Sequence, residues 1–250
     1  MLEVSGITRI FGGVTALDDV SFTIGQGSVT GVIGPNGAGK TTLFNIITGI
    51  YSRTSGSVKL GGKDITGLPP EQLARLGMVR TFQNIELFGA MTVLENVMVG
   101  LHTKSSSGLL ACSLMMPWSI AEERRIRKAA MHWLEFTGIT GLADDTAGNL
   151  SFGNGRLLEI ARALAVEPRI ILMDEPAAGL NSQETLGLAQ LIGKIRGMGI
   201  TVVLVEHDME LVMDVCDRIV VLNLGKKLAE GTPREIQENT EVIAAYLGDG

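Results

Sequence analysis

The 250-residue sequence predicts an α/β fold built around a mostly parallel sheet. Three continuously apolar runs, residues 170–173, 201–205 and 219–222, alternate with stretches of helical periodicity. Strands that are apolar on both faces are typical of parallel sheets covered by helices on both sides. A glycine-rich segment, residues 34–41, also separates an apolar strand-like run from a helical one, and this order is typical of α/β proteins.

The N-terminal region predicts strands followed by a helix. We expect strands over residues 2–8, 20–24 and 28–33, and polar and apolar residues alternate in 20–24 as in a half-buried strand. A helix should begin near Gly39 and end at Gly49, because glycine commonly follows the last helical turn.

The middle of the chain, residues 86–149, has helical periodicity and few strand signals. We interpret it as a helical insertion into the α/β core. The last segment, residues 235–250, predicts one or two short helices, whereas the apolar stretch 109–118 fits either a helix of the insertion or a membrane-proximal loop.

Composition excludes several classes of function. Lys and Arg number 21 against 27 Asp and Glu, a net charge of −6, so nucleic-acid binding is not expected. Cys112 and Cys216 stand far apart without a C-x-x-C pair, which argues against a zinc ribbon or a redox motif and suits a reducing compartment. No signal peptide is evident, and no apolar run reaches the ~18 residues of a membrane span.

The segment after the third predicted strand fits the phosphate-binding pattern G-x-x-x-x-G-K-[ST]. Its residues are Gly34, Pro35, Asn36, Gly37, Ala38, Gly39, Lys40 and Thr41, followed by Thr42. Glycines allow successive N–H groups to turn toward a phosphate, and the helix N-terminus favours an anion. We expect Lys40 to reach the β- and γ-phosphates and the Thr41 hydroxyl to bind Mg²⁺.

A second motif is the apolar run 170–173 followed directly by Asp174 and Glu175. Two carboxylates at the end of a buried strand are costly unless their charges serve a purpose. We expect Asp174 to hold Mg²⁺, directly or through water, and Glu175 to act as the general base toward the attacking water.

At this point the chain resembles the ABC ATPases. Residues 150–156, LSFGNGR, are similar to the signature motif of that family, and they precede the 170–175 strand as in the family. Gln83 resembles the Q-loop glutamine, His207 the switch histidine and Phe11 the aromatic residue that stacks on adenine. Residues 176–181 are similar to the D-loop.

The resemblance implies a single ABC ATPase domain over residues 1–250. A RecA-like P-loop NTPase core with an N-terminal antiparallel β subdomain would occupy 1–86 and 150–250, and a helical signature subdomain would be inserted at 87–149. It also implies a dimer that sandwiches ATP. Each ATP would touch Lys40 of one subunit and Ser151 and Gly153 of the other, and Gln83 would join Thr41 and Asp174 at Mg²⁺.

Within that family, residues 79–88, 91–97, 175–181, 205–209 and 245–248 are similar to ATPase subunits of branched-chain amino acid importers. This implies a peripheral protein on the cytoplasmic face of the cell (inner) membrane. Its partners would be integral-membrane permease subunits, a second ATPase subunit (the same chain or a paralogue) and, indirectly, a periplasmic or extracellular solute-binding protein. Leu87, Phe88 and Met91 either fill the local core or receive a helix of the permease.

The signature departs from the usual pattern at Asn154 and Gly155, which puts the hydrolysis rate and dimer affinity in question. Asn181 stands where many ABC ATPases have a D-loop aspartate. Alternatives are therefore a nucleotide-gated binding module with little hydrolysis, uptake of urea, amides or other amino acids, or export. A soluble ABC protein of DNA repair or translation is disfavoured by the acidic charge and the single ATPase unit.

Overall fold

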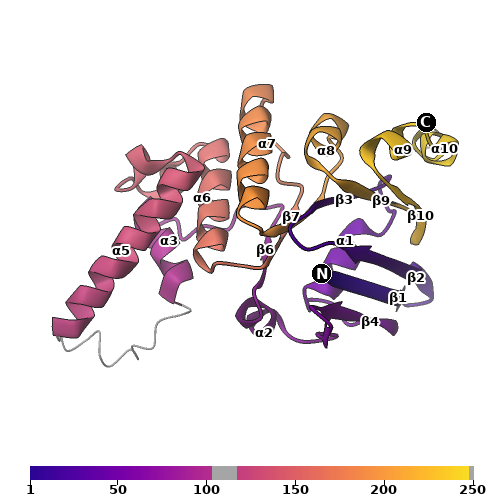
Figure 1. The fold of residues 1–250 in the computed structure, drawn as a ribbon, viewed down its shortest axis with the longest axis horizontal. Helices are drawn as coiled ribbons and strands as arrows, with labels where there is room; N and C mark the ends of the chain where they lie inside the picture. The colour runs from indigo at the N-terminus through magenta and orange to yellow at the C-terminus, as the bar shows by residue number, and fades with distance from the viewer. Residues whose placement is uncertain (103–116, 248–250) are drawn as a thin grey trace. The chain divides into compact units, whose positions relative to one another are not determined.

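The computed structural model describes residues 1–102 and 117–247 and divides them into two compact units (Figure 1). The first unit joins 1–83 to the chain from 169 onward, and the second is the continuous segment 84–168. The expectations for Cys112, Gly248 and most of the 109–118 stretch fall outside the described residues.

The N-terminal strands of the first unit form a four-stranded antiparallel sheet in the order β2-β1-β4-β5. Their bounds are β1 (Leu2–Phe11), β2 (Val14–Ile24), β4 (Ser55–Leu60) and β5 (Lys63–Asp64). This is the expected antiparallel β subdomain, but β1 and β2 are longer than the expected 2–8 and 20–24. Gly12 and Gly13, with φ of 51° and 93°, make the turn of a hairpin that extends both strands.

A six-stranded sheet of order β10-β9-β3-β8-β7-β6 forms the centre of the first unit. All neighbouring strands are parallel except β9 and β10, which form an antiparallel hairpin. The bounds are β3 (Val29–Ile33), β6 (Met78–Thr81), β7 (Ile170–Asp174), β8 (Thr201–Val205), β9 (Arg218–Asn223) and β10 (Lys226–Gly231). The mostly parallel sheet is thus confirmed, and β3, β7 and β8 are buried at every residue.

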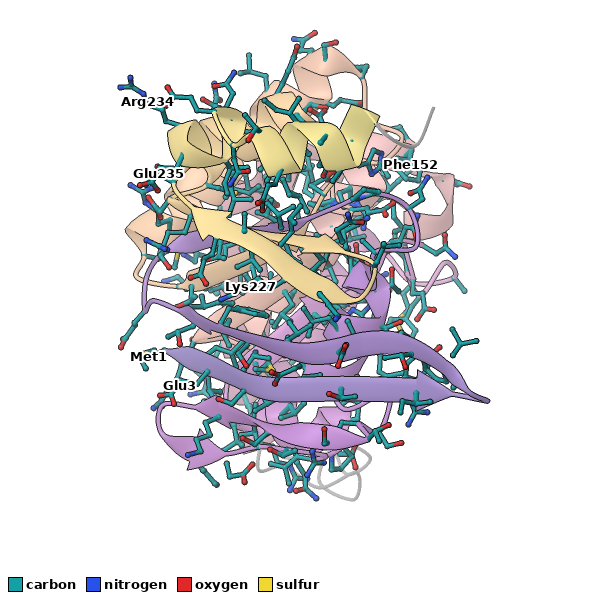
Figure 2. All side chains as sticks on the ribbon, turned by 90° about the vertical axis from the view of Figure 1, so that its right-hand side faces the viewer. Met1, Glu3, Phe152, Lys227, Arg234 and Glu235 are labelled. Atoms are coloured by element: carbon teal, nitrogen blue, oxygen red, sulfur yellow. The ribbon has the colours of Figure 1, made fainter. Side chains whose placement is uncertain are left out.

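Helices cover both faces of this sheet (Figure 1). Those of the first unit are α1 (Lys40–Ile47), α2 (Pro70–Arg75), α7 (Ser182–Gly197), α8 (Met209–Val215), α9 (Pro233–Gln237) and α10 (Thr240–Leu247). One core cluster joins apolar residues of β1 and β2, of α1 and of the six-stranded sheet, so α1 is fixed between the two sheets. Figure 2 shows β10, with Lys227, beside β2, and Met1 and Glu3 mark the start of β1.

The second unit is helical, as its periodicity predicts. Its elements are α3 (Val93–His102), α5 (Pro117–Thr137), α6 (Phe152–Ala165) and two short 3₁₀ turns at Thr140–Leu142 and Ala147–Asn149. The helices α3, α5 and α6 pack against one another in every pairing. Their contacts bury Val97, Trp133, Leu134 and Leu158.

The boundaries expected for the helical insertion, 87 and 149, need correction to 84 and 168. Helix α6 follows residue 149, yet it belongs to the helical unit, because its apolar face packs on α3 and α5. The signature residues at the start of α6 therefore fall within the second unit and not within the α/β core.

Two further observations concern the described residues. No helix among them is long and apolar enough to cross a membrane. Cys216 is a buried thiol, and burial raises its pKa to about 12, so it has no thiolate character at neutral pH.

Candidate nucleotide-binding site

The glycine-rich turn joins β3 to α1, as the sequence predicts. Gly34 is buried with φ of 153°, and a Cβ there would overlap the Leu222 carbonyl oxygen. Gly39 precedes α1 with φ of 100°, and a Cβ there would lie 2.7 Å from Leu17 Cδ2. Only glycine meets both requirements, so the turn retains its shape and its free N–H groups at the helix N-terminus.

The rest of the turn is graded from buried to exposed. Ala38 is buried, Pro35 and Thr42 are half-buried, and Asn36, Gly37 and Thr41 are exposed. The exposed tip of the turn and Thr41, in the first turn of α1, are accessible to a ligand. Ala38 anchors the other side of the turn, because its carbonyl oxygen accepts a hydrogen bond of 3.1 Å from the N–H of Gly225.

Lys40 is the first residue of α1 and its side chain folds back over the turn. Its Nζ donates to the carbonyl oxygens of Gly34 (2.6 Å) and Pro35 (3.0 Å). Burial lowers the pKa of Lys40 below 10.5, against the opposing effect of the Glu175 and Asp174 carboxylates. The ammonium is therefore a partly desolvated cation, which suits the binding of a phosphate anion.

Asp174 ends β7 and is buried, with its side chain 6% exposed. Its Oδ2 forms an ion pair of 2.5 Å with Nη2 of Arg80, whose side chain is 7% exposed. Arg80 was not among the site residues predicted from the sequence. It stands out only once β6 is paired with β7, because it is then a charged residue beside the apolar residues 170–173 of β7.

Glu175 lies at the centre of a polar cluster. Its Oε2 accepts 2.7 Å from Gln83 Nε2 and lies 3.9 Å from Nδ1 of His207, so the structure brings three of the predicted residues together. The backbone of Glu175 adopts φ of 47°, a left-handed conformation that a non-glycine residue rarely adopts and that is concentrated at functional sites. Its N–H is fixed by the Val205 carbonyl oxygen at 2.9 Å.

Glu206, which directly follows β8, is a second site residue that was not predicted from the sequence. It is fully buried, and its carboxylate accepts from the N–H groups of Ala177 (2.7 Å), His207 (3.1 Å) and Asp208 (3.4 Å). Burial raises its pKa above 4.5, and these three N–H donors oppose the shift. Glu206 thus ties the segment after Glu175 to the loop of His207.

Phe11 lies at the end of β1, with its side chain partly exposed. Its ring meets the Tyr51 ring edge-on at 5.8 Å, and the Arg9 guanidinium lies 4.2 Å from its centroid. The strand that continues this hairpin packs on the phosphate-binding turn, because Ala16 and Leu17 lie against Gly39. Stacking of Phe11 on adenine stays a prediction.

The signature residues lie in the helical unit, at the N-terminus of α6. Ser151 is the N-cap, and its Oγ accepts 3.3 Å from Asn154 N–H. Gly153 lies buried in the first turn, where the backbone N–H groups have no carbonyl partner within the helix. A hydroxyl, a glycine backbone and a helix N-terminus together form an arrangement suited to a phosphate group.

Two of the three residues that depart from the usual motifs, Gly155 and Asn181, have well-defined local environments. Gly155 is helical and buried, and a Cβ added there would meet Ile85 at 3.5 Å and Leu87 at 3.7 Å, which are ordinary contacts. Asn181 caps α7, since its Oδ1 accepts from the N–H of Gln183 and of Glu184, both at 3.0 Å. Asparagine and aspartate are equally good at an N-cap, so Asn181 preserves this function of the D-loop position.

The side chains predicted to bind the metal have the chemistry that Mg²⁺ prefers when it is bound with a nucleotide. Thr41, Gln83 and Asp174 supply a hydroxyl, an amide and a carboxylate, all hard oxygen donors. Across residues 1–102 and 117–247, no group of three or more His, Cys, Asp or Glu forms a metal cage. Mg²⁺ is typically bound by one or two carboxylates plus substrate phosphates, so a site with one buried carboxylate agrees with that pattern.

Comparison with protein families identifies an ABC transporter ATP-binding domain in this chain. The model described as "ABC transporter" matches residues 17–178, and the one described as "Branched-chain amino acid ATP-binding cassette transporter" matches residues 226–250. The high-affinity branched-chain amino acid transport ATP-binding protein BraF of Pseudomonas aeruginosa is 48% identical over 250 residues, covering 100% of this chain and 98% of that protein. LivG of Escherichia coli, described in the same words, is 45% identical over 251 residues, covering 100% and 98%.

Solved structures agree with the fold. The ADP conformation of MJ1267, an ATP-binding cassette of an ABC transporter, superposes with a TM-score of 0.86 at 36% identity, covering 99% of this chain and 98% of that one. A dimeric post-hydrolysis state of the cassette MJ0796 bound to ADP and Pi gives 0.79 at 29% identity, covering 94% and 99%. The chain therefore belongs to the ABC transporter ATP-binding proteins, and it is an ATPase subunit of the branched-chain amino acid transport group.

Proposed function

We propose that this chain binds and hydrolyses ATP to drive an importer of branched-chain amino acids. The observation that carries the proposal is the cluster at Glu175, where a carboxylate in a strained backbone conformation contacts both Gln83 and His207. The relatives named for branched-chain amino acid transport supply the substrate class.

In this proposal ATP binds at the turn between β3 and α1. Lys40 leaves the carbonyl oxygens of Gly34 and Pro35 and binds the β- and γ-phosphates, since its ammonium lies at the turn. Thr41, Gln83 and Asp174 hold Mg²⁺, which when bound neutralises developing charge on the phosphates. Glu175 accepts a proton from the attacking water, and His207 contacts the γ-phosphate.

The signature residues act on a second subunit. Ser151 and Gly153 present a hydroxyl and a helix N-terminus to the γ-phosphate held by the partner's Lys40. ATP then joins the two subunits, and loss of the γ-phosphate releases them. The second subunit is either another copy of this chain or a paralogue.

We place the protein at the cytoplasmic face of the inner membrane, bound to integral-membrane permease subunits and acting indirectly with a solute-binding protein. Phe88 and Met91 are 47% and 38% exposed in the helical unit, which supports docking of a permease segment there. Apolar side chains exposed together commonly mark such contacts.

The test is steady-state ATPase activity of the purified chain as a function of protein concentration, with Mg²⁺ in excess. Composite sites predict a rate per subunit that rises with concentration and is abolished in Lys40→Ala. Glu175→Gln should bind ATP with wild-type affinity and form a stable dimer by size-exclusion chromatography, with turnover lowered by about 10²-fold or more. Undiminished turnover of Glu175→Gln would contradict the general-base role, and ATP binding without turnover in wild type would favour the nucleotide-gated module.

The substrate class needs a test in cells. Uptake of labelled leucine, isoleucine and valine should be lost when the gene is deleted, and restored by wild type but not by Lys40→Ala. Loss of urea uptake, or of uptake of another amino acid, with normal leucine uptake would reassign the transported solute.

A further inference from the structure

We propose that Arg80 is a positioning residue for the metal site: it holds the Asp174 carboxylate in place by joining it to α1. This inference rests on the role proposed above for Asp174 at Mg²⁺. Arg80 itself touches neither nucleotide nor metal in the proposal, because it acts through Asp174.

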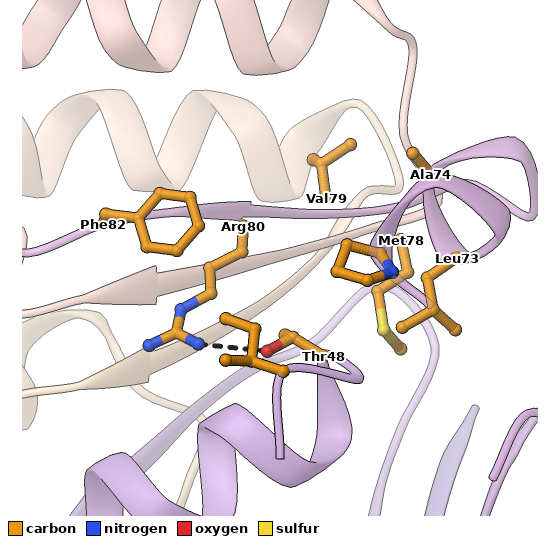
Figure 3. A pocket seen from close by; sticks show the side chains of 9 residues that line it. Thr48, Leu73, Ala74, Met78, Val79, Arg80 and Phe82 are labelled. Carbon is orange, nitrogen blue, oxygen red and sulfur yellow. Dashed lines mark hydrogen bonds between the residues drawn. The ribbon is translucent and has the colours of Figure 1, made fainter. Parts of the chain in front are cut away.

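The geometry places Arg80 between two elements of the site. Nη2 binds Asp174 Oδ2 at 2.5 Å, and Nη1 binds Asn45 Oδ1 at 2.7 Å and Thr48 Oγ1 at 3.0 Å. Asn45 lies in α1 and Thr48 is its C-cap, so the helix that begins with Lys40 is connected to the end of β7 through one guanidinium. Figure 3 shows the Arg80 side chain reaching from its strand to Thr48.

Two aromatic rings lie near the Arg80 guanidinium. The Phe82 ring centroid lies 5.1 Å from Arg80 Cζ and that of Phe44 lies 5.8 Å away. Phe82 immediately precedes Gln83, so the same group also packs beside the Q-loop. Arg80, Phe82 and Thr48 line a cavity of about 290 Å³, and Thr48 lies next to the Arg80 side chain (Figure 3).

This arrangement leaves one carboxylate oxygen for the metal. Oδ2 of Asp174 is held by Arg80, and the described residues make no hydrogen bond to Oδ1. A carboxylate held at one oxygen has a fixed orientation, and groups that orient a metal ligand in this way contribute about 10- to 100-fold to metal affinity.

Lysine cannot replace arginine in this position. A guanidinium has two Nη atoms in a planar fork and binds Asp174 with one and α1 with the other. An ammonium on a flexible stem is a single point donor and lacks that geometry. The proposal therefore requires the shape of the arginine fork as well as its charge.

The experiment measures binding of a fluorescent ADP, N-methylanthraniloyl-ADP, to the full chain in EDTA and in excess MgCl₂. ADP lacks the γ-phosphate that would join two subunits, so the readout stays within one chain. The variants are Arg80→Gln and Arg80→Lys, and the matched control is Arg75→Gln, an exposed arginine of α2. Thermal melts of each variant report whether it folds.

We expect both Arg80 variants to bind the fluorescent ADP in EDTA within about twofold of wild type, and the affinity gained on adding Mg²⁺ to fall by about tenfold or more. Arg75→Gln should keep the full gain. Equal losses of affinity with and without Mg²⁺ would overturn the proposal, because they would mean that Arg80 only supports the fold or the phosphate-binding turn.

A full Mg²⁺-dependent gain in either Arg80 variant would also overturn it. If Arg80→Gln does not fold, Arg80→Lys alone tests the proposal: a full Mg²⁺-dependent gain, or equal losses of affinity with and without Mg²⁺, would overturn it. Absence of any Mg²⁺-dependent gain in wild type would instead refute the proposed metal site, so the two failures are distinguishable.

Discussion

Replacing Gly155 with alanine should stabilise the helical unit, although this glycine stands in the signature segment. Gly155 lies in α6, and its N–H already donates to the Ser151 carbonyl oxygen at 2.9 Å, so the backbone there is helical. Glycine in a helix interior costs about 1 kcal/mol relative to alanine. The added methyl would meet Ile85 and Leu87 at 3.5–3.7 Å, and its burial contributes up to about 0.8 kcal/mol more.

The expected gain in free energy of unfolding is therefore about 1–2 kcal/mol, which corresponds to a rise in Tm of about 2–8 °C for a chain of this size. Gly100 in α3 is the matched control, because it is a second helical glycine of the same unit. A Cβ at Gly100 would lie 2.6 Å from the Arg162 carbonyl oxygen and 3.2 Å from Ala165 Cβ, so α3 and α6 would have to separate. Gly100→Ala should lower stability by about 1–3 kcal/mol.

Differential scanning calorimetry of wild type and both variants measures the two shifts. Opposite signs, upward for Gly155→Ala and downward for Gly100→Ala, are the expected result. A Tm that falls in Gly155→Ala, or rises in Gly100→Ala, would refute the reasoning from contact distances. ATPase assays of Gly155→Ala then separate stability from function, since Ser151 and Gly153 are left unchanged.

Two further predictions concern the segments that flank Glu175. Asn181→Ala removes the N-cap of α7 and should lower the free energy of unfolding, measured in urea, by about 1 kcal/mol. Asn181→Asp should keep a stability close to that of wild type. An equal loss of stability in both variants would contradict the capping role. For Glu206, burial raises the pKa above 4.5, so the folded chain holds a proton that the unfolded chain releases. The stabilisation from this bound proton is present below about pH 4.5 and is lost as the pH rises through the folded pKa of Glu206. Wild type should therefore lose stability relative to Glu206→Gln as the pH rises over this window, and urea unfolding midpoints of both proteins across pH measure the difference. A gain in the stability of wild type relative to Glu206→Gln would contradict the raised pKa.

The sequence predicted those parts of the fold in which local pattern and tertiary environment agree. The buried strands 170–174 and 201–205 are apolar at every residue but one, Asp174 and Thr201, and were predicted nearly to the residue. Edge strands such as Lys226–Gly231 carry polar residues and have no such signal. The end of the helical unit was misplaced because α6 belongs to it only through its packing on α3 and α5, which no local pattern encodes.

The same distinction applies to the site. Lys40, Asp174, Glu175 and His207 stand in motifs whose spacing is itself informative, and the structure places Glu175 and His207 in contact. Arg80 was not predicted because its partner Asp174 lies far away in sequence, and Glu206 was not predicted although it directly follows an apolar strand. A buried charge is costly without a partner, but sequence alone does not reveal that partner.

Topology explains why these distant segments meet. The strands β3, β8, β7 and β6 are parallel neighbours, so their carboxyl ends open at one edge of the sheet. The phosphate-binding turn, Glu206 with His207, Glu175 and Gln83 each follow one of these ends. Ligands of open α/β sheets bind at this edge, so a polar residue directly after an apolar parallel strand is a candidate site residue even without a motif. Glu206 satisfies that criterion from sequence alone, whereas Arg80, inside its strand, is found only once β6 is paired with β7.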